Sequence, residues 1–200
     1  MSRHLNRLVT LAGLVPAARL VWEAIAGGLG ANPIDAITDT TGVWTLRLLL
    51  ATLAVTPLRR LTGWNRVIAI RRTLGLLAFF YGCLHALTWV VLDQFFALGL
   101  MLEDLAKRPF ITAGATGFAL MVPLAVTSTA GWVRRLGGRR WAQLHRLAYL
   151  SAAAGVVHYY WLVKADTTRP LRYAAVLTAL LGARVAWRLM GGGRRAVGVR

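Results

Sequence analysis

The chain has 200 residues, of which 57% are hydrophobic and only 16% are charged, and its mean hydropathy is +0.56. Soluble domains carry about 25% charged residues, so this composition argues against a water-soluble enzyme, a disordered tail and a fibrous repeat. The single cysteine, Cys83, excludes an intrachain disulfide and a cysteine-based zinc site. Six membrane helices of about 20 residues each would fill most of the chain and leave only short loops.

The charge is strongly basic, with 24 Lys and Arg against 7 Asp and Glu, a formal net charge of +17. In a soluble protein this balance would suggest nucleic-acid binding. Here the basic residues stand in short clusters between apolar runs, which is typical of membrane topology. We therefore expect membrane lipids, and not nucleic acid, to be their partners.

Apolar runs separated by polar residues predict an all-α, polytopic membrane protein built as a six-helix transmembrane bundle. The predicted spans are 8–27, 42–58, 73–91, 110–128, 142–163 and 171–190. We expect residues 1–7 to form a cytoplasmic N-terminal tail, residues 8–190 the helical domain, and residues 191–200 a basic cytoplasmic tail.

The first span is the least regular, because it contains Pro16, Arg19 and Glu23. Arg3 and Arg7 precede its apolar stretch, so a signal peptide is the alternative interpretation. No small-x-small cleavage site follows before Arg19, which favours an uncleaved helix, kinked at Pro16.

Arginine and lysine in the short loops predict the orientation, because basic loops face the cytoplasm. One set should be cytoplasmic: Arg3, Arg7, Arg59, Arg60, Arg66, Arg71, Arg72, Arg134, Arg135, Arg139, Arg140, Arg194, Arg195 and Arg200. The opposite side holds Lys107, Arg108, Lys164 and Arg169. Both termini are then cytoplasmic in a multi-pass membrane protein, and tryptophans such as Trp89 and Trp141 fall near the span ends as interfacial anchors.

Three of the four histidines fall inside predicted spans, where an ionisable side chain is costly and often functional. His85 lies in the outer half of the third span, and His158 lies at a similar depth in the fifth, which runs in the same direction. His145 precedes His158 by 13 residues, about 20 Å along a helix, and should lie near the inner surface. Two imidazoles from facing helices can clamp one haem iron, so this pattern favours haem at His85 and His158, with a second centre or an entry site at His145.

Other interpretations stay open at this point. An intramembrane histidine can simply hydrogen-bond a neighbouring helix. Thirteen residues turn an ideal helix by about 220°, so His145 and His158 share a face only if the helix bends. Gly82 and Gly155 each precede a candidate ligand by three residues and would let a porphyrin approach the backbone, although glycine also serves helix packing.

Basic residues near the inner surface are further candidates for the site. Arg71, Arg72 and Arg146 are placed to pair with haem propionates, a flavin phosphate or lipid headgroups. The chain has no GxGxxG motif, no P-loop and no Ser-His-Asp spacing, so no nicotinamide- or FAD-binding domain is expected. Electrons would have to arrive from another protein or a diffusible carrier.

Five stretches within residues 28–166 carry a family resemblance: LGANPIDAITDTTGVWTL, TPLRRLTGW, RRTLGLLAFFYGCLHALTWVVLD, KRPFITAGATGFALMVPLAVTS and WAQLHRLAYLSAAAGVVHYYWLVKAD. In this order they resemble the MsrQ family, the haem-binding membrane subunits of the bacterial periplasmic methionine sulfoxide reductase system. The resemblance implies a six-helix, ferric-reductase-like membrane domain, related to the cores of NADPH oxidases and ferric reductases.

By this resemblance, His85 and His158 are axial ligands of an outer haem b, and His145 is the inner haem histidine. NADPH oxidases carry two histidines on the third helix, whereas the residue 14 positions before His85 here is Arg71. A second haem would therefore need His145 with an unusual or vacant opposite ligand. One haem b is implied, a second is left open, and FMN is implied as a further cofactor without an assigned site.

The family role implies electron transfer from the quinone pool or a cytoplasmic flavin reductase to a periplasmic molybdenum-containing methionine sulfoxide reductase, for repair of oxidised envelope proteins. This chain would be the electron-transfer subunit and would not itself reduce methionine sulfoxide. Two rivals remain: a stand-alone ferric reductase or quinone-linked cytochrome b, and a small membrane transporter or scaffold with structural histidines.

Overall fold

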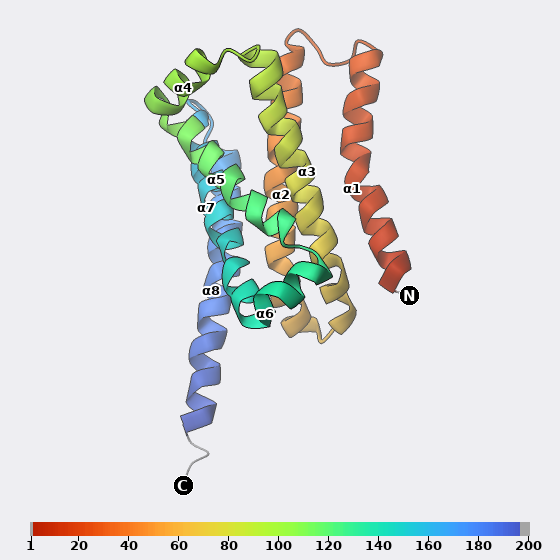
Figure 1. Ribbon diagram of the computed structural model, residues 1–200, viewed down its shortest axis with the longest axis vertical. Helices are drawn as coiled ribbons and strands as arrows, with labels where there is room; N and C mark the ends of the chain where they lie inside the picture. Colours follow the sequence, from red (N-terminus) through yellow and green to blue (C-terminus); the bar gives the residue numbers. More distant parts are fainter. Residues whose placement is uncertain (1, 197–200) are drawn as a thin grey trace.

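The computed structural model describes residues 2–196, with side chains for residues 4–190, and the predicted all-α bundle is confirmed. Met1 and residues 197–200, which belong to the two predicted tails, lie outside the described residues. Six long helices run up and down the bundle (Figure 1). They are α1 Ser2–Ile25, α2 Pro33–Thr62, α3 Arg71–Leu87, α5 Pro109–Val126, α7 Leu147–Leu162 and α8 Thr168–Ala196.

Four shorter elements join these helices. They are the 3₁₀ helix η1 Asn65–Ile70, the π-helix η2 Thr88–Asp93, α4 Leu98–Lys107 and α6 Ala130–Leu144. Helix α6 is broken at Gly137, whose φ of 73° and ψ of 148° are backbone angles that only glycine adopts readily. Neither α4 nor α6 was predicted, because both are short and carry charged residues rather than an apolar run.

The bundle has two chemically distinct ends (Figure 1). The start of α1, η1, α6 and the end of α8 lie together at what we call the α6 end. The α1–α2 loop, η2, α4 and the α7–α8 loop lie at the opposite, α4 end. The predicted charge segregation follows this division, since the arginines of α6, of η1 and of the start of α3 lie at one end and the acidic residues lie at or near the other.

Five helical segments are long and apolar enough to cross a membrane. The exception among the long helices is α7, whose 16 residues span about 24 Å, less than the roughly 30 Å of a hydrocarbon core. It still runs from α6 to the α4 end beside α5 (Figure 1). The predicted span 142–163 is wrong at its start, because α6 ends at Leu144 and α7 begins only at Leu147.

The core lies where two helix pairs, α2 with α3 and α5 with α7, meet. Its buried side chains include Leu46, Leu49, Leu53, Leu77, Ala78, Tyr81, Met121, Ala148, Ala152 and Val156. Small residues let α5 and α7 approach closely: a Cβ on Gly117 would stand 3.4 Å from the Ser151 carbonyl oxygen, and the Ser151 hydroxyl donates to the Gly117 carbonyl at 2.9 Å. Such contacts drive helix association in lipid, where apolar side chains gain little by leaving the bilayer.

Helix α1 is held to α3 by the fully buried Tyr81. The Tyr81 hydroxyl donates to the Gly13 carbonyl at 2.7 Å and accepts from the Ala17 amide at 3.0 Å. In a regular helix these two backbone groups would pair with one another. A side chain that bonds to both groups next to Pro16 agrees with the predicted kink, because a proline ring crowds the preceding turn of its helix.

Helix α2 has a second proline, Pro57, and its freed carbonyl is also paired from another helix. Pro57 has no amide hydrogen, so the Leu53 carbonyl lacks its intrahelical donor. The Arg184 guanidinium of α8 donates to it through Nη2, and donates through Nη1 to the Leu180 carbonyl at 3.1 Å. Neighbouring helices thus repair proline defects that lipid could not solvate.

Replacing Tyr81 tests the α1–α3 connection. We expect Tyr81→Phe to destabilise the protein by about 1–3 kcal/mol, because two buried backbone groups lose their partner. Thermal unfolding in detergent measures the effect. The control is Tyr160→Phe, which makes the same change at an exposed residue of α7, and equal stability of the two variants would contradict this role for Tyr81.

Candidate functional site

His85 of α3 and His158 of α7 face one another across the bundle, near its α4 end. Their ring centroids are 6.0 Å apart and the ring planes meet at 76°. Both side chains are largely enclosed by neighbouring helices. The structure therefore brings together the two residues that the sequence pairs.

Each ring is fixed by a hydrogen bond to a carbonyl of the helix packed beside it. His85 Nδ1 lies 3.1 Å from the Thr38 carbonyl oxygen of α2, and His158 Nδ1 lies 2.7 Å from the Phe110 carbonyl oxygen of α5. A carbonyl oxygen only accepts, so Nδ1 carries the hydrogen in both rings. Nε2 then keeps its lone pair, which is the arrangement found in metal-binding histidines.

Two glycines make these carbonyls reachable. Gly42 follows Thr38 by four residues and Gly114 follows Phe110 by four, so each glycine lies over the accepting carbonyl on the same helix face. A Cβ on Gly42 would stand 2.9 Å from His85 Cε1, and one on Gly114 would stand 2.7 Å from His158 Nδ1. Any other residue at either position would push the imidazole off its carbonyl.

The glycines that the sequence pointed to have a different environment. A Cβ on Gly82 would meet the Phe118 ring at 3.3 Å, and one on Gly155 would meet Leu46 Cδ1 at 3.5 Å. These contacts are with side chains of adjacent helices, which supports the helix-packing interpretation. Sequence reasoning missed Gly42 and Gly114 because they lie on the helices opposite the histidines.

His145 lies in the turn between α6 and α7, and not inside the fifth span as predicted. Its Nδ1 lies 3.1 Å from the Trp141 carbonyl oxygen, and its ring stacks on the Trp141 indole with centroids 3.8 Å apart. Trp141 is itself anchored by its Nε1, which donates to the Thr127 carbonyl at 2.9 Å. His145 Nε2 is buried without a hydrogen-bond partner among the described residues.

Basic residues of two other helices are linked to His145 and to Tyr149, which follows it by four residues. Burial lowers the pKa of the His145 imidazole, and the charge of Arg71, the first residue of α3, lowers it further. Arg184 of α8 is 9% exposed, and its guanidinium carbon lies 5.3 Å from the centre of the Tyr149 ring. We call His145, Arg71, Arg184 and Tyr149 the inner cluster. Sequence reasoning found only the first two of these residues.

The imidazole nitrogens of the outer pair, His85 and His158, and that of His145 fit an iron ion held in a macrocycle. About 2 Å separates a metal ion from a ligating imidazole nitrogen, so two axial imidazoles on one ion have ring centres roughly 6 Å apart, as His85 and His158 do. The orphaned Nε2 of His145 offers a ligand at the inner level. Trp89 of η2 follows His85 by four residues, and its indole Nε1 is likewise buried without a hydrogen-bond partner among the described residues, so it can donate to an anionic group.

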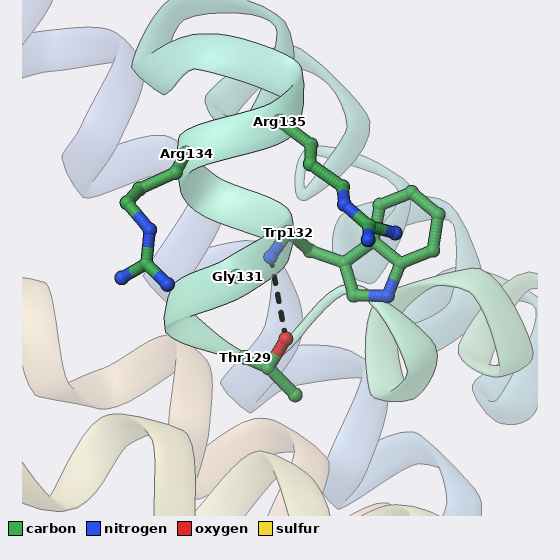
Figure 2. Close-up of a pocket in the computed structure, with 5 residues that line it drawn as sticks. All are labelled: Thr129, Gly131, Trp132, Arg134 and Arg135. Atoms are coloured by element: carbon green, nitrogen blue, oxygen red, sulfur yellow. Dashed lines mark hydrogen bonds between the residues drawn. The ribbon is translucent and has the colours of Figure 1, made fainter.

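Two surface hollows lie away from the histidines. One, of about 490 Å³, is at the start of α6, where Trp132 donates its amide to Thr129 Oγ1 at 3.3 Å and Arg135 folds over the Trp132 ring (Figure 2). Arg134 points away from that ring in Figure 2. The other, of about 380 Å³, lies between α1 and α2, and Trp44, Arg47 and Glu23 line it.

The family model described as "Ferric reductase like transmembrane component" matches residues 41–156, so the chain belongs to this class of multi-pass membrane proteins. A relative from Ralstonia nicotianae is 53% identical, with 92% of this chain and 86% of the relative covered. Relatives from Herminiimonas arsenicoxydans and Bordetella pertussis are 50% and 48% identical, with 92% and 96% of this chain and 85% and 94% of the relatives covered. Each is named protein-methionine-sulfoxide reductase heme-binding subunit MsrQ. The chain belongs to the MsrQ family, and the resemblance seen in the sequence is confirmed.

Filling the space above the Phe110 carbonyl tests how His158 is held. We expect Gly114→Ala to destabilise the protein by about 1–3 kcal/mol, because the added methyl group overpacks the site and breaks the His158 hydrogen bond. Thermal unfolding in detergent measures the loss. The matched control is Gly182→Ala in α8, where a Cβ meets nothing within 4 Å; a Gly114→Ala protein as stable as this control would show that His158 does not need the glycine.

Proposed function

We propose that this chain is a haem-carrying electron-transfer subunit of a protein-methionine-sulfoxide reductase. The observation that carries the proposal is the pair His85 and His158, whose rings lie 6.0 Å apart with both Nδ1 atoms on backbone carbonyls. This arrangement leaves two Nε2 lone pairs for one iron. The MsrQ relatives are named heme-binding subunits, which supports the same cofactor here.

In this proposal His85 and His158 hold an outer haem b as its axial ligands. Haem, when bound, supplies a one-electron couple whose potential depends on axial ligands, hydrogen bonds and burial. The protein would orient the cofactor's ligands: the Thr38 and Phe110 carbonyls fix the two imidazole rings, and the surrounding helices exclude water. The partnerless Trp89 indole is a donor for an anionic edge of the group at this level.

The inner cluster supports a second haem site with His145 as its ligand. His145 Nδ1 is held by the Trp141 carbonyl and its Nε2 has no partner among the described residues. Arg71 stands 14 residues before His85, the position at which NADPH oxidases carry a second histidine on the third helix. Its charge contributes to the lowered pKa of His145, after the larger effect of burial. We assign Arg71 to the cofactor-binding residues of this level, as a partner of the iron or of a propionate.

The direction of transfer follows from the orientation of the bundle. Arginine clusters make the α6 end cytoplasmic, with both termini, in the bacterial inner membrane. Electrons would enter there from the quinone pool or a cytoplasmic flavin reductase and leave at the α4 end toward a periplasmic molybdenum-containing reductase. The FMN expected from the family resemblance stays a prediction without assigned residues.

Two other functions share part of these features. A stand-alone ferric reductase or quinone-linked cytochrome b would use the same histidines, and reduction of a periplasmic methionine sulfoxide reductase by the purified, reduced protein separates it from our proposal. A transporter or scaffold with structural histidines would show no Soret band after expression with ample haem.

Alanine variants test the outer ligands. We expect His85→Ala and His158→Ala each to lose the outer haem completely, and the double variant to lose no more, because one missing axial imidazole already opens the site. Haem-to-protein stoichiometry and the Soret spectrum measure this, with His4→Ala as the control at an exposed histidine of α1. Full haem content in either single variant would show that its histidine is not a ligand.

The inner ligand is tested separately. We expect His145→Ala to lose about half of the bound haem and to keep the spectrum of the outer haem, because His145 precedes the start of α7 whereas His158 lies near the end of this helix. It should also abolish electron delivery to the periplasmic reductase from a cytoplasmic-side donor. An unchanged haem content would remove the second haem from the proposal and leave the outer site standing.

A further inference from the structure

Arg184 is a buried cation that no acidic side chain balances. It is 9% exposed and is the one charged residue among the buried residues of the described chain. The three described ion pairs, Arg19 with Glu23, Lys107 with Glu103 and Arg108 with Asp104, lie elsewhere.

The backbone contacts of Arg184 do not explain why it is charged. Its guanidinium donates hydrogen bonds to the Leu180 carbonyl and to the Leu53 carbonyl. Pro57 leaves the Leu53 carbonyl without its intrahelical donor. A neutral amide or hydroxyl could serve the same carbonyl. These two bonds leave three of the five guanidinium hydrogens for another acceptor. A cation buried in a membrane bundle without a counter-ion is strongly unfavourable, so an anion bound beside it is the expected complement.

The contacts of Arg184 indicate where along the bundle axis the anion would lie. Arg184 packs on the Tyr149 ring in the first turn of α7, and Tyr149 follows His145 by four residues. A haem on His145 would bring two propionate carboxylates to this region, and guanidinium groups bind carboxylates in two-point contacts.

We propose that Arg184 binds a propionate carboxylate of the haem that His145 ligates. This inference rests on the inner haem of the proposed function. Arg184 is then a positioning residue with two tasks: it pairs the Leu53 carbonyl of α2, and it fixes the orientation and charge environment of the inner cofactor.

The first test is the midpoint potential of the inner haem in the full-length protein, measured by spectroelectrochemical titration. Arg184→Gln should shift this potential to more negative values, because a nearby positive charge favours the ferrous form. Arg184→Lys should keep part of the wild-type potential. Arg188→Gln removes the same charge from an exposed residue one turn away and should leave the potential almost unchanged; a shift in Arg188→Gln as large as in Arg184→Gln would overturn the proposal.

A second variant separates the two tasks. Pro57→Ala restores an amide hydrogen at position 57, so the Leu53 carbonyl regains its intrahelical donor. The double variant Pro57→Ala/Arg184→Gln should regain stability and outer-haem content but keep the shifted inner potential. If it regains the wild-type inner potential as well, Arg184 acts only through the Leu53 carbonyl and the proposal fails.

A third arm identifies the anion. The inner site is loaded with haem or with haem dimethyl ester, which has no carboxylate for a guanidinium to bind, and the affinities are compared: Arg184→Gln should weaken the binding of haem but leave the binding of the ester as in wild type. A difference that persists with the ester means that Arg184 faces another oxyanion, such as a lipid phosphate, and overturns the assignment.

Failure of the inner haem itself is a separate outcome. Full haem content in His145→Ala would refute the inner haem, and with it this inference. Loss of haem in His145→Ala with no shift in Arg184→Gln would refute the inference alone.

Discussion

Hydrogen bonds from a side chain of one helix to a backbone carbonyl of another hold this bundle in its functional form. Tyr81 binds the Gly13 carbonyl, Arg184 the Leu53 carbonyl, His85 the Thr38 carbonyl and His158 the Phe110 carbonyl. In hydrocarbon no water competes for these acceptors, and an unpaired polar group is costly. The same bonds therefore stabilise the helices against one another and fix which imidazole nitrogen carries hydrogen.

The arrangement divides the core into two halves. His85 is anchored within the pair α2 and α3, and His158 within the pair α5 and α7. These are the helix pairs that pack most closely, whereas contact between the two pairs is less extensive. A ligand held by both imidazoles would join the halves, so cofactor binding and tertiary stability should depend on each other in this protein, as they do in other metal-binding folds.

The long helices and the matching depth of His85 and His158 could be predicted because they depend on apolar length and on ionisable residues within single segments. What the sequence could not give depends on which helices become neighbours. Gly42 and Gly114 belong to the helices opposite the histidines, and Arg184 meets the Leu53 carbonyl across 131 residues of chain. The break before α7 also escaped prediction, since the residues around His145 are as helix-compatible as those on either side.

The π-helix η2 begins three residues after His85 and leads into Phe95 and Phe96, both in left-handed backbone with φ of 47° and 60°. The hydrogen-bonded turn of a π-helix holds one more residue than that of an α-helix, so the change of helical register falls after His85. The regular α-helix from Arg71 to Leu87 carries the imidazole, whereas the exposed rings of Phe95 and Phe96 follow the π-helix. The direction in which this aromatic loop leaves the bundle is therefore determined by backbone that lies beyond His85.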